Sequence, residues 1–285
     1  HCLCELVSSE NSFNIGMTIL FGVLWGVGGL TFGLSMRYLG VALGQSIALG
    51  TCAGLGTVMG PILLNIFFPE QGALASLTTS VLLGVAVTLL GIAIIGIAGS
   101  MKASTLSEEE KKAAVKDFNF PRGIVIALLA GFMSGCFNVG LAFGEGINFG
   151  DLTPDMFKTL PATFLVTLGG FATNAIYCFY QNHKNGTWSD YRKGNVWINN
   201  LFFCVLAGAL WYSQFFGLSL AKGFLIESDT LMTLSFCILM ALNVTFSNVW
   251  GIILKEWKGC SSLTIAVLIL GLVVLIASSF LPQLI

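Results

Sequence analysis

The stretch WGVGGLTFGLSMRYLGVALGQSIALG (residues 25–50) decides the fold of this chain. It is apolar and rich in glycine, and its single charge, Arg37, lies near its middle. If the stretch crossed a membrane as one helix, the guanidinium would lie inside the bilayer at a cost of about 2.5–3.5 kcal/mol. If two helices meet at Arg37, the charge stays in water at a corner. The sequence therefore predicts two helices with a turn at Arg37.

The rest of the chain shares this apolar character. Of its 285 residues, 55% are hydrophobic and only 9% are charged, whereas soluble domains carry about 25% charged residues. The mean hydropathy is +0.87. The net charge of −1 gives no basic footprint for nucleic acid, so no nucleic-acid partner is expected. The composition predicts an all-α, polytopic membrane protein whose surroundings are the lipid bilayer.

Eight apolar runs reach the roughly 20 residues that a helix needs to cross a bilayer core. They are predicted at residues 13–35, 41–66, 73–99, 122–144, 157–181, 196–219, 229–254 and 262–282. All but Lys158 and Lys222 of the 13 Lys and Arg residues then fall on one side of the membrane. Because cytoplasmic loops collect Lys and Arg, that side is predicted to be cytoplasmic, with both termini of the chain outside.

A weak internal repeat relates the two halves of the sequence. FGLSMRYLG (32–40) matches FGLSLAKG (216–223), and the next helices end in VMGPILL (58–64) and VWGIILK (249–255). Equivalent helices run in opposite directions, so the repeats are inverted, as in transporters that bind substrate at the repeat interface.

The repeat also sets the predicted domain organisation. Residues 122–285 form a complete second repeat of five helices, residues 1–99 form three helices of the first, and residues 100–121 form a cytoplasmic connector. The expected parent fold has ten helices in a five-plus-five arrangement, with two N-terminal helices outside this sequence.

Three motifs resemble the bacterial L-rhamnose–proton symporter family of the drug/metabolite transporter superfamily. They are the opening stretch, GALWYSQFF (208–216) and IILKEW (252–257), and the resemblance runs over essentially the whole chain. It implies a ten-helix carrier in the bacterial inner membrane that imports a deoxyhexose with a proton. The N-terminal pair of helices is the departure from that pattern.

A sugar site needs aromatic faces for C–H groups and amides for hydroxyl groups. The predicted substrate-binding residues are Trp211, Tyr212, Gln214, Gln45, Asn138, Asn174 and Asn248, several of which we expect to converge on a central cavity. Asn243 lies on the same predicted helix as Asn248 and is given less weight than Gln214. The alternative is that each amide only bonds helix to helix, which is worth about 0.6 kcal/mol.

Proton coupling needs a group that titrates within the membrane. No acidic residue lies centrally in a predicted helix, and the candidates are Glu145 and Asp229, both near outer helix ends. Glycines on both sides of Glu145 allow the helix to end there, while the alternative is an interfacial carboxylate in water. Glu256 is predicted to form a local ion pair with Lys255.

Glycines spaced by four, such as Gly22 with Gly26 and Gly29 with Gly33, predict closely packed helices. The pair Cys2 and Cys4 resembles half of a metal site but has no second ligand pair, so neither a metal nor a cofactor is expected.

The predicted function is secondary transport of L-rhamnose or a related sugar with a proton. One alternative is a carrier of another small metabolite. A membrane-embedded sensor or enzyme is less favoured, because no span shows a nucleophile–base pair.

Overall fold

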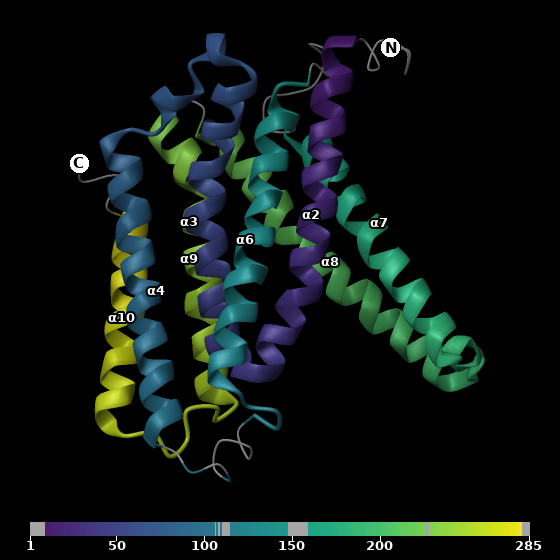
Figure 1. The fold of residues 1–285 in the computed structure, drawn as a ribbon, viewed down its shortest axis with the longest axis vertical. Coiled ribbons are helices and arrows are strands. Elements are labelled where there is room, and N and C mark those ends of the chain that lie inside the picture. Colours follow the sequence, from purple (N-terminus) through teal and green to yellow (C-terminus); the bar gives the residue numbers. More distant parts are fainter. Residues whose placement is uncertain are drawn as a thin grey trace.

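The protein is a bundle of long antiparallel helices (Figure 1). The computed structural model describes residues 9–105, 107, 109, 115–147, 159–225 and 228–280. The long helices are α2 (Ser9–Leu39), α3 (Val41–Phe67), α4 (Thr79–Thr105), α6 (Phe120–Glu145), α7 (Leu160–Asn185), α8 (Gly194–Phe224), α9 (Asp229–Ile253) and α10 (Ser262–Phe280). Short 3-10 turns η1 (Pro69–Gln71), η2 (Ala73–Ser76) and η4 (Thr187–Arg192) connect some of them.

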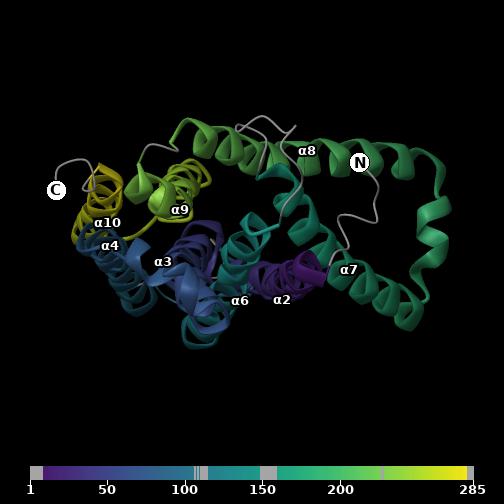
Figure 2. The same cartoon turned by 90° about the horizontal axis from the view of Figure 1, so that it is seen from above.

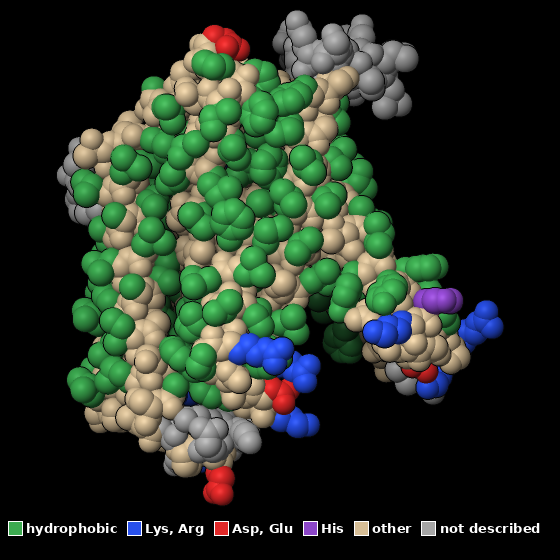
Figure 3. Space-filling model, in the orientation of Figure 1, with side chains coloured by type: hydrophobic (Ala, Val, Ile, Leu, Met, Phe, Trp, Pro, Cys, Tyr) green, Lys and Arg blue, Asp and Glu red, His purple; other side chains and the backbone are tan. Residues whose placement is uncertain are grey.

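These helices confirm a polytopic, all-α membrane protein. Among the described residues, seven helices are long and apolar enough to cross a membrane, and Ser262–Ser278 within α10 is a shorter apolar helix. Hydrophobic side chains cover the flank of the bundle seen in Figure 3, while Lys and Arg gather at its lower end and at the tip of the α7–α8 hairpin. The charged groups therefore lie where helices end and the apolar surface lies between.

The helix boundaries predicted from the sequence differ most from the observed ones at α4. The sequence predicts a helix over 73–99, but Ala73–Ser76 forms η2 and the helix runs from Thr79 to Thr105. The shift brings Lys102, predicted to lie in a connector, into the last turn of α4. There Lys102 is 1% exposed and its ammonium donates to the backbone oxygen of Glu256. A partner for the buried ammonium thus allows the helix to continue past its apolar run.

The turn at Arg37 is confirmed. Helix α2 ends at Leu39, α3 begins at Val41, and Gly40 between them has φ of 88°. Arg37 is exposed at this corner, where its Nε lies 2.7 Å from Asp117 Oδ2. The charge therefore lies at the end of a helix, beside a carboxylate.

Glu256 closes the same corner from the other half of the chain. Its carboxylate accepts hydrogen bonds from the backbone N–H groups of Val41 (3.0 Å) and Ala42 (3.1 Å), the first residues of α3. The predicted pairing of Glu256 with Lys255 is wrong. Lys255 has φ of 60°, which turns the chain after α9 and brings the carboxylate under the positive end of the α3 dipole. We call Gly40, Lys102 and Glu256 the α3–α9 junction.

Close approach of α2 to its neighbours explains part of the glycine pattern. A Cβ on Gly22 would lie 2.3 Å from the backbone oxygen of Val166 on α7, and one on Gly26 would lie 2.6 Å from Thr173 Cβ. These two glycines pack as predicted. Gly29 and Gly33 have no described atom within 4 Å of such a Cβ, so their spacing does not mark a contact.

The end of α7 and the start of α8 spread away from the bundle, whereas the first half of α7 packs against α2 (Figures 1 and 2). Every described side chain of α8 from Trp197 to Trp211 is exposed, whereas Phe215, Leu218 and Lys222 nearer its end are buried. Among the described residues, the buried side chains of α8 therefore all lie in its second half, and this half packs against the other helices.

Candidate functional site

A cavity of about 550 Å³ lies between α2, α3, α6, α7, α8 and α9. We call it the central cavity. Its polar lining residues are Gln45, Ser134, Asn174, Gln214 and Asn243. Its aromatic lining residues are Trp25, Phe32, Phe137, Trp211, Phe215 and Phe236. The volume lies in the range of about 300–1,000 Å³ typical of small-molecule sites, and the mixture of aromatic and amide groups is typical of them too.

Two amides that line this cavity are hydrogen-bonded to each other. Asn243 Nδ2 on α9 donates to Gln214 Oε1 on α8, at 2.9 Å. That bond leaves the amino group of Gln214 and the carbonyl of Asn243 available to a ligand. Gln45 on α3 is half-buried and makes no hydrogen bond in the described part of the chain. Asn174 on α7 donates to Gly170 O of its own helix at 2.9 Å, so its side chain is held in place.

The indoles of Trp25 and Trp211 stack on one another, although they come from α2 and α8. Their ring centroids are 5.5 Å apart and their planes differ by 18°. Phe137 packs against Trp25 at 5.1 Å, and Phe215 packs against Trp211 at 4.8 Å. The cavity thus has a broad aromatic wall beside its amides.

The central cavity brings together Gln45, Asn174, Trp211 and Gln214 of the residues predicted from sequence. Tyr212, the neighbour of Trp211, is half-buried and lines no cavity found in the described part of the chain.

The remaining two predicted amides bond to other helices. Asn248 is fully buried and donates to Ser46 Oγ at 2.7 Å and to Val244 O at 2.9 Å. Asn138 donates to Gly56 O on α3 at 2.9 Å. Asn248 therefore joins α9 to α3 as a packing contact, whereas Asn138 also lines a second cavity, described below.

Two residues that line the central cavity, Trp25 and Asn243, were not among the substrate-binding residues predicted from the sequence. Both have a signal in helical spacing, because residues three and four apart share a face. Trp25, Gly29 and Phe32 follow that spacing on α2 and all line the central cavity. Phe236, Met240 and Asn243 do the same on α9.

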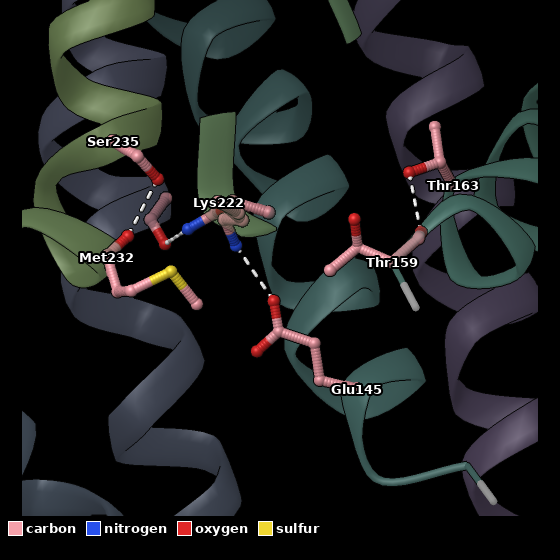
Figure 4. A network of polar contacts seen from close by, with 8 residues as sticks. Glu145, Thr159, Thr163, Lys222, Met232 and Ser235 are labelled. Carbon is pink, nitrogen blue, oxygen red and sulfur yellow. Dashed lines mark hydrogen bonds and ion pairs between the residues drawn. The ribbon is translucent and has the colours of Figure 1, made fainter. Parts of the chain in front are cut away.

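A second cavity, of about 250 Å³, lies between α3, α6, α8, α9 and η2. Its polar lining residues are Thr57, Ser76, Asn138, Glu145, Lys222 and Thr233. Lys222 on α8 and Glu145, the last residue of α6, point toward one another there (Figure 4), with Nζ 2.8 Å from Oε1. The lysine side chain is 10% exposed and the glutamate side chain 41%. Glu145 is therefore paired with a buried cation rather than lying free at the interface.

The other proton candidate, Asp229, begins α9, and its side chain lies outside the described residues. Helix α9 is capped by Ser228, whose hydroxyl accepts from Leu231 N at 3.4 Å. Cys2 and Cys4 also lie outside the described residues. Within those residues, no group of three or more His, Cys, Asp or Glu side chains is arranged to hold a metal ion.

Comparison with known proteins identifies the family. A family profile described as L-rhamnose-proton symport protein (RhaT) matches residues 3–284. Two similar proteins are named L-rhamnose-proton symporter, one from Yersinia pestis (strain Pestoides F) and one from Yersinia pseudotuberculosis serotype O:1b (strain IP 31758). Each is 32% identical to this chain over an alignment of 288 positions. The alignment covers 94% of this chain and 78% of the relative. No solved structure matches this chain. The chain therefore belongs to the L-rhamnose-proton symport protein family, a family of membrane transporters.

Proposed function

We propose that this protein imports L-rhamnose or a related sugar together with a proton, and that the sugar binds in the central cavity. One observation carries the proposal: the stacked indoles of Trp25 and Trp211 lie in the same cavity as the bonded amides of Gln214 and Asn243. A sugar offers C–H faces to the aromatic rings and hydroxyl groups to the amides. The names of the relatives support the same substrate and the same driving ion.

The charge of the central cavity favours a neutral substrate. Among the described residues that line it, none is Asp, Glu, Lys or Arg. A charged metabolite would lose its hydration there without gaining an opposite charge, whereas a sugar exchanges water hydrogen bonds for amide hydrogen bonds. A carrier of another small neutral metabolite is the second candidate that this lining supports. A screen of sugars, polyols and amino acids for ligand-induced shifts of the melting temperature separates the two.

Glu145 and Asp229 are the proposed proton acceptors. A proton on Glu145 would cancel the charge that holds Lys222, so protonation would loosen the contact between α6 and α8. Asp229 begins the helix on which Met232 lines the second cavity. Either carboxylate would thereby link proton binding to the helices that surround both cavities.

The proposed orientation follows the Lys and Arg residues. In Figure 3 they gather at the lower end of the bundle and at the tip of the α7–α8 hairpin, which we assign to the cytoplasm of a bacterial cell. Both termini of the chain would then lie on the outer, non-cytoplasmic side of the inner membrane. The repeat relates α3 to α9, and the helices that follow them in the two halves are α4 and α10. The packing of α3 against α9 and of α4 against α10 supports the proposed inverted repeat.

Uptake of labelled L-rhamnose by vesicles that contain the protein tests this function. We expect an inward proton gradient to accelerate uptake and a protonophore to abolish the acceleration. A rate of sugar uptake that does not depend on the proton gradient would contradict symport but not sugar transport. Vesicles that take up no more sugar than protein-free vesicles would contradict the substrate class.

A further inference from the structure

The two cavities lie one above the other along the same four helices, α3, α6, α8 and α9. Residues Gln45 to Cys52 of α3 line the central cavity, and Thr57 to Leu64, farther along the helix, line the second. On α9, which runs the opposite way, Met232 lines the second cavity and Phe236 the central one. The cavities therefore succeed one another in the direction in which the helices cross the membrane.

A layer of aromatic rings separates them. Phe137 on α6 contacts Phe215 on α8 with ring centroids 4.5 Å apart, and stacks with Phe236 on α9 at 6.3 Å. All three side chains are buried. Asn138, the next residue after Phe137, already lines the second cavity. The separation is thus a single layer of side chains, which we call the aromatic partition.

The second cavity holds polar groups whose hydrogen-bonding capacity is not used up. Thr57 is 1% exposed, and its hydroxyl has no nitrogen or oxygen partner in the described part of the chain. It lies beside the thiol of Cys237, which is only a weak partner. A buried hydroxyl without a good partner costs about 1–3 kcal/mol, which a bound ligand or water would offset. The ammonium of Lys222 has three donors, of which the bond to Glu145 uses one.

The charges and the size of this cavity define the ligand. Lys222 and Glu145 balance one another, so a neutral molecule is favoured over an ion. Hydroxyl groups both accept from an ammonium and donate to a carboxylate, and such charge-assisted bonds are strong. The 250 Å³ volume equals that of roughly eight water molecules at about 30 Å³ each, enough for a single sugar ring.

We propose that the second cavity is a separate binding site for a monosaccharide, and that the aromatic partition is the barrier between it and the central cavity. The inference rests on the proposed sugar transport. Thr57, Asn138 and Lys222 bind hydroxyl groups in this site, and sugar competes with Lys222 for the carboxylate of Glu145. Sugar and proton would then act on one ion pair, outside the site where the sugar meets Gln214.

Equilibrium binding of radiolabelled L-rhamnose to the full chain in lipid nanodiscs tests the two-site proposal. We expect two molecules bound per chain at saturation. Thr57→Val keeps the side-chain shape and removes the hydroxyl, so one class of site should weaken about tenfold, while Gln214→Ala weakens the other class by a similar factor.

The matched control is Thr51→Val, on the same helix. Thr51 donates to Ile47 O of its own helix and lines neither cavity, so both affinities should be unchanged. A single site per chain would overturn the second cavity as a sugar site. If that single site weakens in Gln214→Ala, the proposed function still stands. No saturable binding of L-rhamnose would overturn both proposals.

Discussion

Lys222 Nζ lies 2.8 Å from Glu145 Oε1, although the two residues are 77 positions apart in the chain. The pair joins the end of α6 to the end of α8. Its two members differ in burial, because the lysine side chain is 10% exposed and the glutamate side chain 41%. The desolvation cost therefore falls mainly on the lysine.

This difference predicts an asymmetric effect on stability. Glu145→Gln leaves a buried ammonium without an opposite charge and should lower the melting temperature more than Lys222→Met, which leaves a carboxylate that water can reach. The loss should be smaller than the roughly 3–5 kcal/mol of a fully buried pair, because Glu145 is partly exposed. The double variant should recover much of the loss. Thermal unfolding in detergent measures all three.

The exposed pair of Asp190 and Lys193, at 2.6 Å, is the control. Asp190→Asn should change stability by no more than about 0.5 kcal/mol. An equal effect of Glu145→Gln and Asp190→Asn would contradict a buried charge at Lys222.

The bond from Asn243 to Gln214 predicts coupled effects on sugar binding. Gln214→Ala should weaken binding about tenfold, because it removes one hydrogen bond to the sugar and leaves Asn243 without its partner. Asn243→Ala should weaken binding less. The double variant should lose less than the sum of the two single losses, since neighbours in one network are not additive. Titration calorimetry gives the four affinities, and strict additivity would mean that the two amides act independently.

The contact of Glu256 with α3 predicts a loss of stability when its carboxylate is removed. Glu256→Ala should cost about 1–2 kcal/mol, because two backbone N–H groups and the helix dipole lose their partner. Glu256→Gln keeps an accepting oxygen and should cost less. Glu70→Ala, at an exposed site in η1, is the control and should have little effect. An unchanged melting temperature in Glu256→Ala would show that water replaces the cap.

The approach of α2 to α7 predicts opposite effects of alanine at two glycines of one helix. The new Cβ in Gly22→Ala would meet the backbone oxygen of Val166, so the helices must separate at a cost of about 1–3 kcal/mol. Gly16→Ala meets no described atom within 4 Å and should stabilise the helix by up to about 1 kcal/mol. Thermal unfolding compares the two variants. Destabilisation by both would mean that α2 does not tolerate alanine in place of glycine even where no neighbour is close.

Local patterns predicted most of the fold. Apolar runs of sufficient length located the helices, and the position of Arg37 between two of them located the turn. Contacts between distant parts of the chain could not be found in this way. Glu256 caps a helix that begins 215 positions earlier, and nothing near Glu256 in the sequence indicates that partner. Its neighbour Lys255 offered a simpler ion pair, which the left-handed turn at Lys255 prevents.

The candidate site shows the same limit. Of the amide and aromatic residues predicted from the apolar runs, Gln45, Asn174, Trp211 and Gln214 line the central cavity. Successive residues of a helix point about 100° apart, so a shift of one position changes the cavity that a side chain faces. The depth of each helix in the bundle also decides which cavity a residue lines. Asn138 was therefore grouped with the central cavity, although it lines the second.

The α3–α9 junction has a mechanical consequence. Two hydrogen bonds tie the start of α3 to Glu256 in the chain that follows α9, and the buried Lys102 of α4 donates to the backbone oxygen of the same residue. A helix of 27 residues is about 40 Å long, so tilting α3 by about 10° around this fixed end would displace its far end by about 7 Å. In such a tilt the junction would be the pivot. The largest displacement would then fall at the far end of α3, beyond the second cavity.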